Sequence, residues 1–245
     1  KCIRCKKCID SCNQNAIEFK GNRLCIDKEK CTNCKACVTK CPTHAIYYDS
    51  DDEDIDYIID QCLKDIDFFE ESGGGVTLSG GEPLMQIDVA VKILKKLKEL
   101  NINTAVETTG FVNRDSLIKA SKFIDLFLFD IKHWNRNSHK WATGVYNDLI
   151  IENLKYLIEL KKNILVRIPI IPGFNDSIND AVKFSELFNK VGIKRVQLLP
   201  FHQFGENKYN LLNKDYYYKG EKSYKKEDIN FISQTMKLNG IDAII

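Results

Sequence analysis

The pattern of apolar and polar residues changes character along the chain. From position 76 onward, short apolar runs of β type alternate with longer segments in which apolar residues recur every three or four positions. The short runs predict strands at 76–79, 104–107, 126–131, 164–170 and 195–200. The longer segments predict helices at 87–100, 115–123, 147–161, 178–191 and 226–239. This alternation predicts an α/β fold with a parallel sheet and crossover helices.

The number of strand–helix units narrows the architecture. Five units are too few for a closed barrel of eight strands, so we favour an open, partial (β/α) barrel over a doubly wound sheet, which is the structural alternative. Unusual residues fall at or just past the strand ends, at 79–83, 107–110, 130–133, 167–172 and 200–202. Because the carboxyl ends of parallel strands form one rim where ligands bind, these residues predict a shared site.

One more amphipathic helix is predicted before the first of these strands. Its apolar face comprises Ile55, Ile58, Ile59, Cys62, Leu63, Ile66 and Phe69. We interpret Cys62 as a core residue and not as a metal ligand, because it lies on this face. Residues 49–71 hold eleven acids and one lysine, which marks a boundary near Tyr48 to Glu53. We therefore expect one domain at 1–48 and a second at 49–245.

Nine of the ten cysteines lie in the first 41 residues. They include two runs with the spacing C-x2-C-x2-C-x3-C, offset by 29 residues, and Lys1, Lys6, Ala16 and Ile17 recur at the same offset. This is an internal duplication. At this spacing three thiolates wrap one corner of a [4Fe-4S] cluster, and the fourth reaches the other cluster. The spacing therefore assigns two ligand sets: Cys2, Cys5, Cys8 and Cys41 for one cluster, and Cys31, Cys34, Cys37 and Cys12 for the second.

Zinc and disulfides are the alternatives for these cysteines. Zinc takes four ligands, usually as two separated pairs, and close thiols in a cytosolic protein bind metal more often than they cross-link. The spacing matches that of bacterial ferredoxins, so we predict a small ferredoxin-like α+β domain at the amino terminus. Cys25, between Leu24 and Ile26, is predicted to be a buried strand residue.

Composition and charge exclude several classes of protein. With 245 residues, 44% of them hydrophobic and 29% charged, the chain can bury a core and is neither disordered nor collagen-like. A net charge of +2 gives no reason to expect a nucleic-acid or membrane partner. No apolar run approaches the roughly 18 residues of a membrane span, and no signal peptide pattern opens the chain, so we expect a cytoplasmic protein. Residues 1–41 hold ten basic and four acidic residues, which predicts a solvated face that offsets cluster charge; docking of an acidic electron donor is the alternative.

The rim residues resemble motifs of the radical S-adenosylmethionine superfamily, and within it those of the activating enzymes of glycyl radical enzymes. The resemblance covers essentially the whole chain. The segment after the first predicted strand is similar to the motif whose backbone and acid receive the methionine amino group: Ser79, Gly80, Gly81, Glu82 and Pro83. Paired glycines let the backbone approach the ligand, and a carboxylate can accept hydrogen bonds from an ammonium. A later segment resembles the aspartate-x-lysine motif, whose lysine meets the ligand's carboxylate: Asp130, Ile131 and Lys132.

The same resemblance implies further contacts with S-adenosylmethionine. Arg167 and His202 correspond to family positions around the ligand's carboxylate and its ribose or adenine, and residues 199–205 resemble the final-strand signature. Glu107 and Thr108 lie where these activating enzymes bring a carboxylate and a hydroxyl toward the cofactor, with a monovalent cation shared with Asp130 as an option. Three other histidines are assigned structural roles: His44, His133 and His139.

By this resemblance the protein is an oxidoreductase of anaerobic metabolism. A donor such as flavodoxin or ferredoxin would reduce the clusters, and S-adenosylmethionine would be cleaved to a 5'-deoxyadenosyl radical. That radical would take a Cα hydrogen from a glycine of a partner glycyl radical enzyme. The two-cluster insert is typical of activating enzymes for partners other than pyruvate formate-lyase. The alternatives are a radical enzyme acting on a small molecule or another protein residue, and an electron-transfer protein with an inactive barrel.

One motif of the superfamily does not occur in the sequence. Its catalytic cluster is held by C-x3-C-x2-C after the first barrel strand, and the 245 residues contain no such triplet. In related activating enzymes with a two-cluster insert, the triplet precedes the insert. We therefore expect the complete protein to extend upstream of Lys1, with the first strand and the cysteines of a third [4Fe-4S] cluster.

Overall fold

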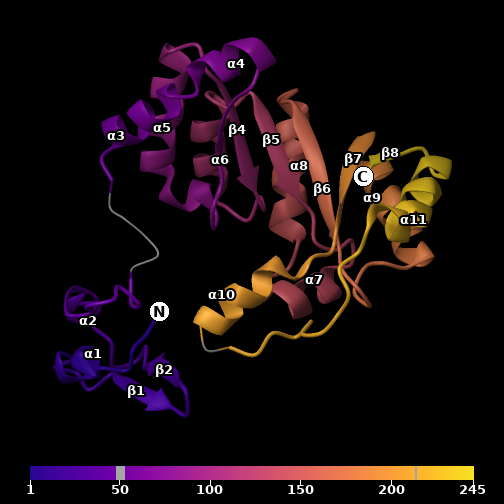
Figure 1. The fold of residues 1–245 in the computed structure, drawn as a ribbon. Helices are drawn as coiled ribbons and strands as arrows, with labels where there is room; N and C mark the ends of the chain where they lie inside the picture. The colour runs from indigo at the N-terminus through magenta and orange to yellow at the C-terminus, as the bar shows by residue number, and fades with distance from the viewer. Residues whose placement is uncertain (48–52, 213) are drawn as a thin grey trace. The chain divides into compact units, whose positions relative to one another are not determined.

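The computed structural model describes residues 1–47, 53–212 and 214–245. The chain divides into two compact units, which we call the head and the barrel unit (Figure 1). The head comprises Lys1–Glu53 with Lys208–Asp215, and the barrel unit comprises Asp54–Asn207 with Tyr216–Ile245. The boundary predicted between residues 48 and 49 lies outside the described residues.

The head contains a two-stranded antiparallel sheet, two short helices and, in its second segment, residues 208–211 of a third helix. The strands are β1 (Ile17–Lys20) and β2 (Arg23–Ile26), and the helices are α1 (Lys7–Asp10) and α2 (Ala36–Thr39). Cys25 lies in β2 as predicted, although it is only partly buried.

The head's backbone repeats the 29-residue offset of its sequence. Six non-glycine residues of the head have positive φ, and they form three pairs at this offset. The pairs are Arg4 (58°) and Asn33 (55°), Lys6 and Lys35 (both 63°), and Asn15 and His44 (both 48°). Lys6 and Lys35 immediately precede α1 and α2. Left-handed conformations are unfavourable for lysine and arginine, so the same strained loop is built twice around the cysteines.

The barrel unit is built on a parallel sheet of six strands. In chain order these are β3 (Gly75–Leu78), β4 (Asn103–Thr108), β5 (Leu126–Asp130), β6 (Ile164–Ile170), β7 (Arg195–Pro200) and β8 (Asp242–Ile244). The strands lie side by side in the same order, β3-β4-β5-β6-β7-β8. A doubly wound sheet reverses its strand order at a switch point, so this order confirms the partial barrel and excludes the alternative.

The predicted crossover helices are all present with small changes of boundary. They are α5 (Ile87–Glu99), α6 (Arg114–Ser121), α8 (Asp148–Glu159), α9 (Ile178–Val191) and α11 (Lys226–Leu238). Shorter elements were not predicted: η1 (Pro83–Gln86), α7 (Arg136–Thr143), η2 (Gln203–Gly205), α10 (Glu206–Leu211) and β8. In the described ranges no helix combines the length and the apolar character that a membrane crossing needs.

The two faces of the sheet differ in burial. Alternate strand residues such as Val106, Phe129 and Ile168 are fully buried and belong to one core with helix residues such as Leu154 and Phe184. The residues between them point to the opposite face, because successive strand side chains alternate. We call this opposite face the inner face.

The helix predicted at 55–69 is divided in two. It forms α3 (Ile55–Leu63) and α4 (Ile66–Ser72), separated at Lys64 and Asp65. The seven predicted apolar residues nevertheless pack on a second core cluster around Ile59 and Leu97. Cys62 is among them, which agrees with its predicted packing role, and burial raises the pKa of its thiol.

Candidate functional site

Three strands and one loop bring polar side chains together on the inner face of the sheet. Ser79 follows β3, Glu107 lies in β4, and Asp130 is the last residue of β5. Arg167 lies in β6, directly opposite Asp130 in the strand register. Ser79, Glu107 and Asp130 lie at or next to the carboxyl ends of their strands, as the sequence pattern predicts, whereas Arg167 lies in the middle of β6.

Arg167 links two acidic residues of neighbouring strands. Its Nη1 donates to Oε1 of Glu107 at 2.7 Å, and its Nε donates to Oδ1 of Asp130 at 3.0 Å. Ser79 Oγ donates to Oε2 of Glu107 at 2.6 Å, and Lys132 Nζ donates to Oδ2 of Asp130 at 2.8 Å. Each of the four carboxylate oxygens therefore accepts one hydrogen bond, and two acids are matched by two bases. We call these five residues the rim network.

The rim network stabilises the ionised forms of Glu107 and Arg167. The hydrogen bonds from Arg167 and then from Ser79 hold the pKa of Glu107 below its usual value. Burial alone would lower the pKa of Arg167, whose side chain is only 13% exposed. The contacts with Glu107 and Asp130 outweigh this effect and raise it instead. The network is therefore a set of charged pairs near neutral pH.

Glu82 lies beside this network but has different partners. Its Oε1 accepts a hydrogen bond from Thr108 Oγ1 at 2.8 Å. Its Oε2 accepts from the Thr109 backbone N–H at 2.8 Å and from Thr109 Oγ1 at 2.7 Å. These donors are neutral, and Glu82 forms no ion pair within the described ranges. A partly buried carboxylate of this kind is suited to a cationic ligand group such as an ammonium.

Two glycines allow the chain to form the loops around Glu82. Gly80 has a φ of 123°, which residues with a side chain rarely adopt. Gly110 has a φ of 71°, and a Cβ atom there would lie 2.1 Å from the ring of Phe129. The turn that follows Thr108 and Thr109 therefore requires glycine.

Buried asparagines hold the rim loops, and the sequence prediction missed them. Asn153 on α8 is fully buried, and its Nδ2 donates to the carbonyl oxygens of Gly110 and Val112, both at 2.8 Å. Asn175 donates to the carbonyl oxygens of Lys132 and Pro169, both at 2.9 Å. The detectable signal was a polar residue on an apolar helix face, since Ile150, Leu154 and Leu157 flank Asn153 on α8.

The structure does not bring every predicted residue into this group. His202 is exposed, and its Nδ1 accepts a hydrogen bond from the backbone N–H of Phe204 at 3.3 Å. Ile131 is buried in the main core. His133 and His139 are 3% and 2% exposed and have backbone carbonyl partners, which agrees with their structural roles. His44 is exposed and occupies one of the left-handed positions of the head.

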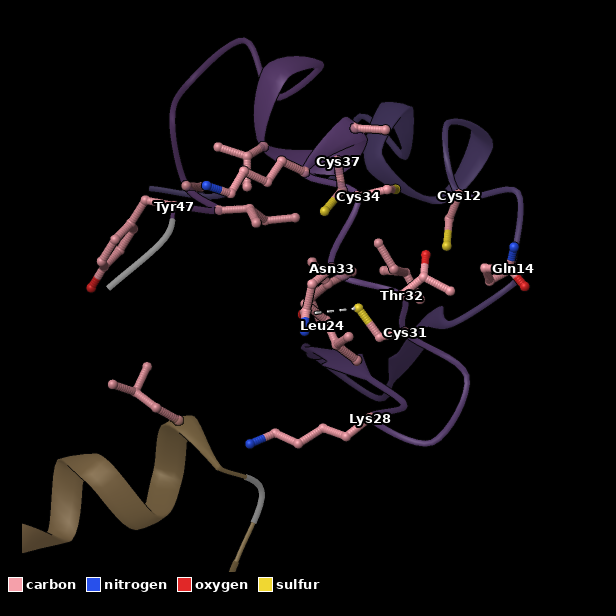
Figure 2. A pocket seen from close by; sticks show the side chains of 18 of the residues that line it. Cys12, Gln14, Leu24, Lys28, Cys31, Thr32, Asn33, Cys34, Cys37 and Tyr47 are labelled. Atoms are coloured by element: carbon pink, nitrogen blue, oxygen red, sulfur yellow. Dashed lines mark hydrogen bonds between the residues drawn. The ribbon is translucent and has the colours of Figure 1, made fainter. Parts of the chain in front are cut away.

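Eight of the nine cysteines of the head line two separate cavities, and Cys25 lines neither. One cavity of about 70 Å³ is lined by Cys2, Cys5, Cys8 and Cys41. The other, of about 640 Å³, is lined by Cys12, Cys31, Cys34 and Cys37, whose side chains point toward a shared space in Figure 2. All ten cysteines are free thiols, so none is used in a disulfide. Within the described ranges no three such side chains converge on a single metal ion.

Backbone N–H groups point at several of these sulfur atoms. Ala16 donates to Cys12 Sγ at 3.3 Å, and Ala45 donates to Cys41 Sγ at 3.2 Å, again at the 29-residue offset. Backbone donors, first that of Ile46, lower the pKa of Cys41 to about 7. Burial instead raises the pKa of Cys8 and Cys37. Four thiols around each cavity, with amide donors directed at sulfur, form a donor set that fits an iron–sulfur cluster.

Two family models match parts of this chain. Residues 31–185 match the family model of the radical SAM superfamily, and residues 1–15 match that of a 4Fe-4S binding domain. The chain is 37% identical over 187 residues to the choline trimethylamine-lyase activating enzyme of Oleidesulfovibrio alaskensis, covering 75% of this chain and 60% of that protein. It is 38% identical over 221 residues to the (2S)-3-sulfopropanediol sulfolyase activating enzyme of Bilophila wadsworthia, covering 89% of this chain and 73% of that protein.

A solved structure shows the same fold. A domain of a pyruvate-formate lyase-activating enzyme from Bacteroides vulgatus aligns with a TM-score of 0.58 at 25% identity, over 70% of this chain and 98% of that domain. The chain spans 60% of the choline trimethylamine-lyase activating enzyme and 54% of a 4-hydroxyphenylacetate decarboxylase activating enzyme from Clostridioides difficile. The two family matches imply iron–sulfur chemistry with S-adenosylmethionine. The chain belongs to the radical SAM superfamily, among the activating enzymes of glycyl radical enzymes.

Proposed function

We propose that this chain carries the S-adenosylmethionine site and two accessory clusters of an enzyme that activates a glycyl radical enzyme other than pyruvate formate-lyase. The observation that carries the proposal is Glu82, a carboxylate with neutral donors next to a charge-balanced rim network. It leaves one uncompensated negative charge at the carboxyl edge of the sheet, where the ligand's ammonium would bind. When bound, the cofactors supply reductive cleavage of S-adenosylmethionine and a radical that takes a glycine Cα hydrogen from the partner.

The residues around Glu82 would bind and orient the ligand. Gly80 and Gly81 let the backbone approach the methionine moiety. Pro83 is the first residue of η1, and the Glu82 side chain accepts a hydrogen bond from the backbone N–H of Leu84 in this turn. Lys132 donates one hydrogen bond to Asp130 and has two further N–H donors for the ligand's carboxylate, while Arg167 holds Asp130 in place. The remaining positions of the proposed binding site support these residues or the nucleoside: Glu107, Thr108, Asp130, Ile131 and His202.

The head would hold two [4Fe-4S] clusters. One would be bound by Cys2, Cys5, Cys8 and Cys41, and the other by Cys31, Cys34, Cys37 and Cys12. The support is that each set of four lines its own cavity. The proposed domains remain a ferredoxin-like domain at 1–48 and a partial barrel at 49–245; the compact units differ in that Lys208–Asp215 groups with the head. A third cluster would be held by a C-x3-C-x2-C triplet, which the 245 residues do not contain.

The proposed partners are two proteins. The relatives are named as activating enzymes of choline trimethylamine-lyase, of a sulfopropanediol sulfolyase and of 4-hydroxyphenylacetate decarboxylase, which supports a glycyl radical enzyme as the protein substrate. A cytoplasmic flavodoxin or ferredoxin would supply electrons to the clusters. We include no monovalent cation in this proposal, because the acids that would bind it already have partners.

Ligand binding by the complete gene product, reconstituted without oxygen, tests the S-adenosylmethionine site. We expect calorimetry to detect binding, and Glu82→Gln to weaken it about ten- to a hundredfold, since a charge-assisted hydrogen bond contributes about 1.5–3 kcal/mol. Glu99→Gln, on the exposed end of α5, is the matched control and should bind normally. Equal affinity in wild type and Glu82→Gln would contradict the proposal.

Radical formation on the partner tests the activity. Reducing the complete protein with S-adenosylmethionine and a candidate partner should produce a glycyl radical doublet in the EPR spectrum. Cleavage of S-adenosylmethionine without that doublet, across the relatives' partner classes, would instead favour a small-molecule or other protein substrate. Iron and sulfide analysis of this chain should give about eight of each, as two cubane clusters require.

A further inference from the structure

The acidic pair of the inner face already has its counter-charge. Glu107 and Asp130 are the acids that, by family resemblance, would share a monovalent cation. In the structure the guanidinium of Arg167 lies between them, 2.7 Å from Glu107 and 3.0 Å from Asp130. The other oxygen of each carboxylate accepts from Ser79 and Lys132 respectively. An alkali ion would have to displace one of these donors or share its oxygen.

The charge balance disfavours such an ion. Arg167 and Lys132 neutralise Glu107 and Asp130, so an alkali ion would add a third positive charge to two negative ones. The side chains of Arg167 and Asp130 are only 13% and 18% exposed, which limits screening by water. Like charges at contact distance repel strongly in such surroundings. These residues therefore do not fit an alkali cation.

The length of the side chain at position 107 explains how one guanidinium spans both acids. Glu107 pairs with Leu128 in the strand register, whereas Asp130 lies two residues further toward the rim and pairs with Arg167. The extra methylene of glutamate extends its carboxylate toward Nη1 of Arg167. Aspartate at position 107 would fall short by about one carbon–carbon bond, roughly 1.5 Å, and would leave a space between the acids.

We propose that Arg167 takes the place of the alkali cation in this chain, so that binding of S-adenosylmethionine requires no alkali ion. Glu107 is then a positioning residue that fixes Arg167, and Arg167 in turn fixes Asp130 and leaves Lys132 at the ligand's carboxylate. This inference rests on the proposed function, because it concerns the same binding site.

Ion substitution tests the inference on the complete, reconstituted protein. We expect the S-adenosylmethionine affinity of the wild type to agree within about twofold between potassium chloride and choline chloride at equal ionic strength. In the Glu107→Asp, Arg167→Gln double variant, affinity should be weaker and at least about fivefold higher in potassium chloride. Arg195→Gln removes an exposed arginine that pairs with Asp242 and is the matched control. A wild-type affinity that falls fivefold or more without alkali ions would overturn the proposal.

A second measurement does not depend on the bound cofactors. Thallium NMR, with Tl⁺ as the probe for potassium, should detect no specific site in the wild-type chain and a site in the double variant. A wild-type thallium signal that disappears in Asp130→Asn would overturn the inference. Should S-adenosylmethionine fail to bind in every salt, the proposed function would fail, and the thallium result would still decide the question of the cation. Tryptophan fluorescence confirms that each variant is folded.

Discussion

The head and the barrel unit reach a defined structure by different means. In the head, the buried apolar residues among those described are Cys8, Ala16 and Ile17, and six non-glycine residues hold left-handed conformations. The barrel unit instead buries a continuous core, with side chains from the sheet and from all five crossover helices. A domain with so little apolar burial is marginal without another source of stability. From this difference we expect the head to depend on metal–thiolate bonds, whereas the barrel unit depends on apolar packing.

Removing iron is the strongest way to break this comparison. We expect chelation of the reconstituted chain to unfold the head completely, because metal binding and folding are coupled in small metal domains. Hydrogen exchange should show full loss of protection in β1 and β2 and little change in β4 to β7. Trp134 and Trp141 are the two tryptophans of the sequence and both lie in the barrel unit, so their fluorescence should stay native.

The control for iron removal is a cysteine outside both ligand sets. Cys25→Ala should keep the iron content and the protection of β1, whereas Cys5→Ala should lower both. A head that keeps its amide protection after all iron is removed would show that packing alone folds it, and the comparison would be wrong.

A core substitution tests the other side of the comparison. Phe129 is fully buried in β5, and Phe129→Ala should destabilise the barrel unit by about 3–5 kcal/mol through lost burial and a cavity. Urea unfolding followed by tryptophan fluorescence measures this, while the visible absorbance of the clusters reports on the head. Phe231→Ala is the control, since Phe231 on α11 is 42% exposed and the change should stay within about 0.5 kcal/mol. Equal losses in the two variants would contradict a packing-based barrel.

The sequence predicted the elements of the barrel unit well, because long periodic segments carry a strong signal. The boundaries of β6 and α9 agree with the structure to the residue. The strand β8 was missed because three residues, Asp242–Ile244, are too few to show an alternating pattern. The break in the helix after Leu63 was missed because the apolar period continues across Lys64 and Asp65.

The polar residues of the rim were predictable as a group, but their pairing was not. Strand ends in a parallel sheet meet at one edge, so Glu107, Asp130 and Arg167 could be placed together from their positions in the sequence. Which atoms meet depends on strand register and side-chain length, and that is how Arg167 comes to lie between two acids. Asn153 was missed because its partners are backbone carbonyls, which no sequence motif marks.

Asn153 provides a way to loosen the rim without emptying the core. Asn153→Ala should destabilise the barrel unit by about 2–3 kcal/mol, because the carbonyl oxygens of Gly110 and Val112 lose their buried donor. The turn that donates to Glu82 would also lose its support, so affinity for S-adenosylmethionine should fall several-fold. Calorimetry and urea unfolding measure the two effects. Asn189→Ala, which removes an exposed donor to Asn239, is the control and should leave both stability and affinity unchanged. If Asn153→Ala lost stability without losing affinity, Asn153 would not position the rim.

The smallest expected effect is the acid sensitivity of Glu107, which sharpens the comparison because it belongs to the barrel unit alone. The pKa of Glu107 is lower in the folded chain, mainly through Arg167, than the value of about 4.3 in an unfolded chain. Its contribution to stability is therefore present above about pH 4.3 and is lost as pH falls through the folded value. The side chain is 35% exposed, so screening by water should keep this contribution below about 1 kcal/mol. Urea unfolding followed by tryptophan fluorescence should find Glu107→Gln less stable than wild type at pH 7, and this difference in stability should shrink toward pH 3. The control, Glu18→Gln in the head, should match wild type at every pH. Each variant is compared with wild type at the same pH, so acid loss of the clusters affects both chains alike. A stability difference between Glu107→Gln and wild type that stays constant from pH 7 to pH 3 would show that the ion pair with Arg167 does not stabilise the barrel unit.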